Sequence, residues 1–441
     1  MGKMGEGKVP NRWVVAIAGT VLQLCLGTVY AWSFFQKPVV TTFGWSNSQA
    51  AWAFSFAICF LGLAAAWGGI NLAKHGPKKL ALTGSVLFSS GYLLGALAFS
   101  MKSLIMLYVG YGMVGGIGLG LCYVTPVATA AKWFPDKKGF ITGMVVMGFG
   151  FGALLMSKII APIFMEMTGE NLVSVFLYIG ILMFVLTIPT ASLLVNPPAG
   201  FVPAGYTPPA AGASAQKGGS AGEISPREAL SSPKFMMMWL VFFLNITAGI
   251  MFIGFQSPMM QDLLKSADPS YGSMAPEAAA KALAAAGATL IAISSVFNGV
   301  GRFFWGGVSD KIGRTNAFRL ILLTQACVFA ALLFVKTPLI FGALVCYVLL
   351  CYGGGFGTMP SFVLDVFGNK LMSTVYGVIL TAWSLAGIVG PQVVATITDV
   401  APASAASYTF IIGGGLLAVG FVVALFLRDS AFARPEGAGA K

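Results

Sequence analysis

A single arginine lies inside a long apolar stretch of this chain. Arg302 falls within the run from Leu290 to Trp305, whose other residues are apolar, small or neutral. Arginine keeps its proton in proteins, and a charge surrounded by hydrocarbon costs several kcal/mol and marks a functional site by default. A guanidinium in such a place needs an anion or a wet cavity beside it. The sequence therefore predicts an anion-binding site.

An amide precedes this arginine by about one helical turn. Asn298 lies four residues before Arg302, so both side chains project from the same face of a helix. The amide can orient the guanidinium, or it can donate a hydrogen bond to an oxygen of a bound ligand. We therefore include Asn298 in the predicted binding site.

Two further charged residues have the spacing of an ion pair. Asp310 ends one expected helix and Arg314 opens the next, in the string Gly306-Gly-Val-Ser-Asp-Lys-Ile-Gly-Arg314. Such a pair can break and re-form as two helical bundles rock, so we expect Asp310 and Arg314 to act as a gating latch. An earlier copy, from Gly68 to Lys78, has Ala73 where the aspartate should be, so the latch is expected in one half only.

The composition assigns these residues to a membrane protein. Of 441 residues, 57% are hydrophobic and 9% are charged, and the mean hydropathy is +0.85, which excludes a soluble domain. A helix needs about 20 apolar residues to cross a hydrocarbon core of about 30 Å. Such stretches occur six times in each half of the chain, at residues 13–35, 47–72, 79–99, 104–131, 139–161 and 173–195, and then at 235–262, 284–308, 316–336, 338–363, 371–398 and 405–427.

The net charge of +12 is explained by the distribution of Lys and Arg along the chain. If the N-terminus is cytoplasmic, 19 of the 26 basic residues fall in cytoplasmic segments. The positive-inside rule then predicts a multi-pass protein of the inner membrane with both termini in the cytoplasm. No basic patch with interleaved aromatic residues is present in the sequence, so a nucleic-acid partner is not expected.

Two halves of similar organisation flank a connector. Residues 197–233 are rich in Pro, Gly, Ala and Ser, which predicts a flexible cytoplasmic link between bundles at 1–196 and 234–441. Glycine-rich strings inside the spans, such as Gly353-Gly-Gly-Phe-Gly357, predict close approach of helices rather than phosphate loops. The string that starts at Pro276 suggests an outward extension of the eighth helix.

Two longer strings make the chain resemble a known family. These are Lys132-Trp-Phe-Pro-Asp-Lys-Lys-Gly139 and the segment from Asn298 to Arg314, with its Gly-x-x-Ser-Asp-Lys-x-Gly-Arg ending. Together with the two six-helix halves they resemble the major facilitator superfamily, and within it the oxalate/formate antiporter family and its monocarboxylate-transporter relatives. The resemblance covers the twelve helices and neither the connector nor the tails. It implies an all-α membrane protein with twelve transmembrane helices in two six-helix bundles.

The resemblance also implies roles for individual residues. The family's arginine in helix 8, which binds the substrate carboxylate, corresponds to Arg302. The aromatic lining of its central cavity corresponds to Tyr30, Tyr123, Tyr352 and Phe356. We therefore expect these aromatic residues to surround the substrate.

One departure from the family concerns the substrate. The oxalate exchanger also uses a lysine in helix 11, and alignment of the string from Val375 onwards assigns Trp383 to that position. Two cations match a dianion, whereas a dianion beside one guanidinium leaves a buried charge that costs several kcal/mol. A monocarboxylate such as lactate, pyruvate or acetate is therefore favoured over oxalate, with the indole of Trp383 packing against its short apolar tail.

A second departure concerns proton coupling. Animal monocarboxylate transporters have an aspartate that resembles a proton carrier at the position of Asn298, which is neutral here. The acidic residues of the apolar regions all fall near span ends, at Asp262, Asp310, Asp365 and Asp399. A proton would therefore travel on the substrate or on a network of tyrosine and water.

The sequence thus predicts a secondary active transporter that moves a small, lactate-like monocarboxylate by alternating access, with proton symport as the expected coupling. An oxalate/formate-type anion antiporter is the alternative, and a membrane receptor that binds the same acid without moving it is a third reading. No grouping of nucleophile and base or of metal ligands is evident in the sequence, so we expect neither an enzyme nor a cofactor. The expected partners are a small carboxylate, protons and the lipid bilayer, and the expected state is a monomer.

Overall fold

The protein is helical wherever the structure describes it. The structure is a computed structural model that describes residues 11–198, 201–203 and 225–430, and it contains no strand in these ranges. Within them, 12 helical stretches are long and apolar enough to cross a membrane. This confirms the expected all-α membrane protein with twelve spans.

The first six spans are built from nine α-helices and three short irregular segments. The first span bends at a 3₁₀ turn, η1, and the fourth and fifth spans each contain a π-helical segment, η2 and η3. The elements are α1 (Arg12–Leu26), η1 (Gly27–Ala31), α2 (Trp32–Phe43), α3 (Asn47–His75), α4 (Pro77–Ser100), α5 (Leu104–Leu107), η2 (Tyr108–Val114), α6 (Gly115–Trp133), α7 (Lys138–Leu155), η3 (Met156–Ile160), α8 (Ala161–Thr168) and α9 (Leu172–Ser192).

The second six spans contain longer uninterrupted helices. The eighth span does begin at Pro276, as the sequence suggested, and α15 carries the tenth span and the start of the eleventh across a bend at Gly368, whose φ is 76°. The elements are α10 (Pro226–Leu230), α11 (Pro233–Ala267), α12 (Ser270–Ser273), α13 (Pro276–Ile312), α14 (Arg314–Leu332), α15 (Pro338–Ile379), α16 (Thr381–Val400), η4 (Pro402–Ser404) and α17 (Ala405–Phe426).

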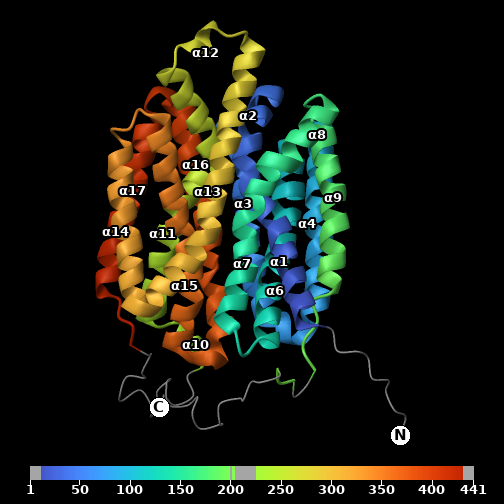
Figure 1. Ribbon diagram of the computed structural model, residues 1–441, viewed down its shortest axis with the longest axis vertical. Helices are drawn as coiled ribbons and strands as arrows, with labels where there is room; N and C mark the ends of the chain where they lie inside the picture. Colours follow the sequence, from blue (N-terminus) through green and yellow to red (C-terminus); the bar gives the residue numbers. More distant parts are fainter. Residues whose placement is uncertain (1–10, 199–200, 204–224, 431–441) are drawn as a thin grey trace.

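The helices of the two halves of the chain lie side by side. Figure 1 shows α1 to α9, in blue to green, on one side of the molecule and α11 to α17, in yellow to red, on the other. We call the end where α1 begins and α17 ends the terminal end, and the end that carries α12 the opposite end. Much of the predicted connector, at 199–200 and 204–224, lies outside the described residues, but 226–230 form α10, which is capped by Ser225 and packs against α15.

Two pairs of helices join the halves along their length, α3 with α16 and α7 with α13. In the contact between α7 and α13, one side chain of α13 forms hydrogen bonds with backbone groups of α7. The hydroxyl of Ser295 on α13 donates to the carbonyl oxygen of Gly150 at 2.5 Å and accepts from the amide nitrogen of Leu154 at 3.2 Å. A side chain from one half therefore inserts into the helical hydrogen-bond ladder of the other, one turn before η3 begins.

Glycines let α15 approach α13 closely, as the sequence predicted. A Cβ atom on Gly353 would collide with the carbonyl oxygen of Asn298, and one on Gly357 with that of Arg302. Small residues at such positions allow two backbones to pack directly against each other. The backbone that carries both predicted polar residues is therefore held against α15.

Candidate functional site

Arg302 lies in the interior of the molecule, among aromatic side chains from both halves. It is 3% exposed and is the one charged residue among the buried residues of the described chain. Its Nη1 atom donates to the hydroxyl of Tyr123, on α6, at 3.4 Å. Its guanidinium carbon lies 5.0 Å from the ring centroid of Phe356, on α15, and 5.9 Å from that of Phe149, on α7. These distances are typical of cation–π interactions, which stabilise the charge without an acid.

The other predicted aromatic residues lie in the same cluster. The hydroxyls of Tyr30, in η1, and Tyr352, on α15, are 2.5 Å apart, so a hydrogen bond joins the two halves here. The indole of Trp383, on α16, has its ring centroid 4.7 Å from that of Phe356 and 5.1 Å from that of Tyr123. The structure thus brings together the five aromatic residues that resemblance had indicated around Arg302.

Several buried polar groups of this cluster have no hydrogen-bond partner among the residues that the structure describes. They are Nε and Nη2 of Arg302, both side-chain atoms of Asn298, and Nε1 of Trp383. Leaving a buried polar group unpaired costs about 1–3 kcal/mol, and more for a charged one. Such groups point to a ligand or water that binds between them.

A small cavity lies beside the cluster. It is closer than Arg302 is to the opposite end, the end that carries α12. Its volume is about 10 Å³, which is room for about one water molecule. Tyr30, Asn298, Gln256, Ser294 and Ser295 contribute the polar part of its wall, and the remainder is apolar. Asn298 and Tyr30 therefore belong both to the cluster around Arg302 and to the wall of this cavity.

Sequence reasoning missed three residues of this region. Phe149 faces the guanidinium, Tyr376 lies close enough to Tyr123 and Arg302 to interact with them electrostatically, and Gln256 lines the cavity. The amide of Gln256 inside an apolar span was a signal that could have been used. Phe149 and Tyr376 carried no such signal, because an aromatic residue in an apolar span is equally suited to lipid contact.

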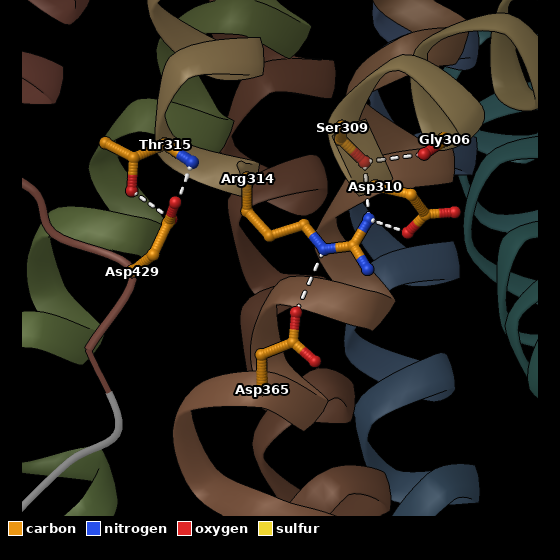
Figure 2. A network of polar contacts seen from close by, with 7 residues as sticks. All are labelled: Gly306, Ser309, Asp310, Arg314, Thr315, Asp365 and Asp429. Atoms are coloured by element: carbon orange, nitrogen blue, oxygen red, sulfur yellow. Dashed lines mark hydrogen bonds and ion pairs between the residues drawn. The ribbon is translucent and has the colours of Figure 1, made fainter. Parts of the chain in front are cut away.

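The predicted latch residues form a network at the terminal end. Figure 2 shows Arg314 between two carboxylates, with Nη1 at 2.5 Å from Asp310 and Nε at 3.0 Å from Asp365. The same Nη1 donates to the hydroxyl of Ser309 at 2.5 Å. These residues belong to α13, α14 and α15, which all lie in the second half. The network therefore ties three helices of one half together, and Asp365 is an additional member.

At the opposite end, polar contacts join the two halves. One carboxylate oxygen of Asp399, near the end of α16, accepts from the backbone nitrogen of Asn47 at 2.9 Å, and the other accepts from that of Ser48 at 2.8 Å. These nitrogens belong to the first turn of α3, where a negative charge is favoured by unpaired N–H groups and the helix dipole. A weaker ion pair joins Lys37 and Asp262 at 3.5 Å. The halves are thus held together at this end.

The sequence matches one protein family over most of its length. This family is described as the Major Facilitator Superfamily, and the match spans residues 16–391. The fold agrees with it. A bacterial homolog of the human lysosomal transporter Spinster, solved in an inward-facing and unoccupied conformation, superposes with a TM-score of 0.67 at 17% identity, over 97% of this chain and 100% of that one.

Individual relatives share a minority of their residues with this chain. The oxalate:formate antiporter of Oxalobacter formigenes is 27% identical over 87% of this chain and 84% of its own length. The apicoplast pyruvate carrier 1 of Toxoplasma gondii is 26% identical over 84% and 81%. Monocarboxylate transporter 12 of Rattus norvegicus is 27% identical, over 36% of this chain and 33% of its own. Each of these names describes a protein that carries a carboxylate.

Proposed function

The chain belongs to the Major Facilitator Superfamily, and from this premise we propose that it is a secondary active transporter of small, lactate-like monocarboxylates. Members of this superfamily are transporters rather than enzymes, and twelve apolar helices make the chain a multi-pass membrane protein. The names of the oxalate:formate and pyruvate carriers support a small carboxylate as substrate. The arrangement of Arg302 is the observation that carries the proposal.

The guanidinium of Arg302 has one edge free for a carboxylate. Its Nη1 is engaged by Tyr123, whereas Nε and Nη2, which form the side edge of the guanidinium plane, have no partner. Two adjacent N–H groups of this kind bind a carboxylate through two parallel hydrogen bonds. A substrate carboxylate on this edge would pair the buried charge and both orphaned donors at once.

The charge around Arg302 favours one carboxylate rather than two. By resemblance, Trp383 stands at the position where the oxalate exchanger has a second cation, a lysine. Besides Arg302, no charged residue is buried in the described chain. A monocarboxylate neutralises the guanidinium, whereas a dianion leaves about one uncompensated charge, at a cost of several kcal/mol. Lactate, pyruvate and similar acids therefore fit this charge balance better than oxalate does.

Transport would proceed by alternating access between the bundles at 1–196 and 234–441. Contacts at the opposite end hold these bundles together in this structure, so that end corresponds to the closed side. From the distribution of Lys and Arg we assign the terminal end to the cytoplasm and the protein to the inner membrane. We propose that it works as a monomer. The Asp310–Arg314 latch, extended by Asp365, joins the cytoplasmic ends of α13, α14 and α15 in this structure, and we propose that it breaks and re-forms as the bundles rock.

Proton symport is the coupling that we propose, and anion exchange is the second candidate. The unpaired guanidinium favours exchange, because the empty transporter must reorient with an uncompensated charge while the loaded one does not. The full-length similarity to an oxalate:formate antiporter points the same way. Symport requires that a proton enter with the acid and that Arg302 then return unpaired. The aromatic rings around the guanidinium lower the cost of that return.

Uptake into proteoliposomes tests the proposal. Labelled lactate and, separately, labelled oxalate are offered with and without an inward proton gradient to the wild type and to Arg302→Lys. We expect gradient-driven lactate uptake in the wild type and a loss of at least about 100-fold in the variant, because lysine keeps the charge but not the two-pronged edge. Arg428→Lys makes the same change at an exposed position and should transport normally.

Other outcomes have equally definite readings. Oxalate exchange at the same rate with and without the proton gradient would show that the protein is an anion antiporter. It would also contradict the argument from Trp383. Lactate uptake that survives Arg302→Lys unchanged would remove Arg302 from the binding site. Saturable binding of lactate without any uptake would favour the receptor.

A further inference from the structure

The wall of the small cavity beside Arg302 contains polar residues that the predicted site did not include. Gln256 comes from α11, and Ser294 comes from α13, one turn before Asn298. All three side chains are buried, with exposed fractions of 2%, 1% and 1%. Polar side chains inside a membrane bundle are costly and usually serve a ligand or a structural bond.

One of these bonds is structural and fixes the orientation of the amide. The hydroxyl of Ser294 donates to the side-chain carbonyl oxygen of Gln256 at 2.7 Å. With its oxygen engaged in this way, the amide of Gln256 has its NH₂ end, with two donors, left for another partner. Ser294 therefore acts on a ligand through Gln256 and is a positioning residue.

The second amide has no internal partner. Both Oδ1 and Nδ2 of Asn298 are buried without a hydrogen bond, and Asn298 lines the same cavity as Gln256. The cavity has room for about one water molecule, which is also about the size of a hydroxyl or keto oxygen. Asn298 stands one helical turn, about 6 Å, from Arg302, within the span of a carboxylate and an oxygen on the adjacent carbon.

We propose that Gln256, held by Ser294, forms with Asn298 a subsite for an oxygen atom on the carbon next to the substrate carboxylate. This inference rests on the proposed function, because the carboxylate must first be bound by Arg302. It assigns the substrate to the 2-hydroxy and 2-oxo monocarboxylic acids rather than to unsubstituted short acids. Both amides are neutral, so the wall provides no cation to balance a second carboxylate.

Lactate and propionate share a carbon skeleton and differ by the hydroxyl on carbon two, so they make a direct comparison. Binding is measured on the purified full-length protein by the rise in its thermal unfolding temperature, and transport is measured by competition with labelled lactate in proteoliposomes. In the wild type we expect lactate and pyruvate to bind at least about 10-fold more tightly than propionate, because an acid without the oxygen leaves buried amides unpaired. This comparison needs no variant.

Variants then assign the preference to the subsite. Gln256→Leu and, independently, Ser294→Ala should reduce the lactate-to-propionate preference to within about twofold, mainly by weakening lactate. Gln261→Leu is the matched control. Gln261 is on the same helix and bonded to Ser257, is buried, and does not line the cavity. The Gln261→Leu variant should keep the lactate-to-propionate preference of the wild type.

The results separate the two proposals. Equal binding of lactate and propionate that is lost in Arg302→Lys would overturn the subsite and leave the carboxylate transporter standing. A wild-type preference that survives both Gln256→Leu and Ser294→Ala would also overturn it. If none of these acids binds, or if their binding is unchanged in Arg302→Lys, both the proposed function and the subsite are overturned.

Discussion

At the scale of single residues, different parts of the Arg302 guanidinium have different partners. The Nη1 atom donates to Tyr123, and the guanidinium carbon lies over the rings of Phe356 and Phe149. The Nε–Nη2 edge has no partner among the described residues. Aromatic faces stabilise a cation by about 0.5–2 kcal/mol each and cannot form an ion pair with it. The charge is thus partly stabilised without an acid that would compete with the substrate for the free edge.

Tyr123 is the residue whose removal tests this division. Tyr123→Phe keeps the ring and removes the hydroxyl that accepts from Nη1. The guanidinium then loses the one hydrogen bond that the described residues give it. We expect the affinity for lactate to fall about 5- to 10-fold, the worth of one hydrogen bond to a charged group in a partly compensated site. The concentration dependence of uptake measures it.

Tyr178→Phe provides the control for this change. Tyr178 lies on α9 with 40% of its surface exposed, away from Arg302, so its hydroxyl should not affect affinity. An unchanged affinity in Tyr123→Phe would mean that the 3.4 Å contact does not orient the guanidinium.

The sequence revealed some residues of the candidate site and concealed others. Arg302 was visible because a charge in an apolar run is conspicuous by itself, and Asn298 followed from helical spacing. Tyr30 and Tyr352 were included only through resemblance. The sequence could not show that η1 and α15 bring their two hydroxyls together across the halves, because that contact depends on how the bundles pack.

At the scale of helices, the position of Arg302 depends on the contact between α13 and α15. Gly357 lies against the backbone of Arg302, and Gly353 against that of Asn298. In a bilayer, helices gain little from hydrophobic association, so close packing of small residues supplies much of the attraction between them. These glycines thus stabilise the pair of helices and also fix the depth of the site.

Gly357→Ala should separate these helices. The added Cβ would collide with the carbonyl oxygen of Arg302, which is backbone and cannot rotate away. We expect a loss of about 1–3 kcal/mol of stability, as for overpacking elsewhere, together with reduced uptake. Thermal unfolding in detergent measures the first effect.

Gly415→Ala is the corresponding change in open space. Nothing lies within 4 Å of the Cβ that it would add on α17. It should leave stability unchanged or raise it by up to about 1 kcal/mol, because alanine favours helix. Equal behaviour of the two variants would contradict the close-packing argument.

The helices were predicted better than their ends and interruptions. Twelve spans follow from hydropathy, since each crossing must satisfy its backbone hydrogen bonds within an apolar segment. Hydropathy stops at the membrane surface, whereas the helix continues, as α11 does to Ala267. The π-helical segment η3 has no sequence signal of its own, and the Ser295 hydroxyl that bonds to Leu154 just before it comes from a distant part of the chain.

At the scale of the whole molecule, Asp399 connects the halves at the closed side. Its carboxylate accepts from backbone nitrogens of Asn47 and Ser48 and from the side chain of Asn47 at 3.0 Å. An anion at a helix N-terminus contributes about 0.3–1 kcal/mol at an exposed site. Because this contact bridges the two halves, opening of this side would break it, so we expect it to contribute to the balance between the two orientations.

Asp399→Asn should shift that balance toward opening of this side. The change keeps the size of the side chain and removes its charge. In a cysteine-free background with Ile253→Cys on the cavity wall, we expect a membrane-impermeant thiol reagent to label from that side about 2- to 5-fold faster. Asp262→Asn is the control, because its ion pair with Lys37 joins two exposed side chains and contributes little. Labelling equal in all three proteins would show that the Asp399 contact does not stabilise closure.

The lone buried arginine also has an electrical consequence. When the site is empty the reorienting region carries one positive charge. A bound monocarboxylate neutralises that charge, but in proton symport the proton that enters with the acid restores it, so the loaded region also carries one positive charge. A membrane potential acts on a translocated charge with up to about 2.3 kcal/mol per 100 mV, so it acts on both forms, which move in opposite directions. With the cell interior negative, the voltage would speed the inward movement of the loaded site and slow the outward return of the vacant one, so the potential would set the pace of the cycle without driving the acid itself.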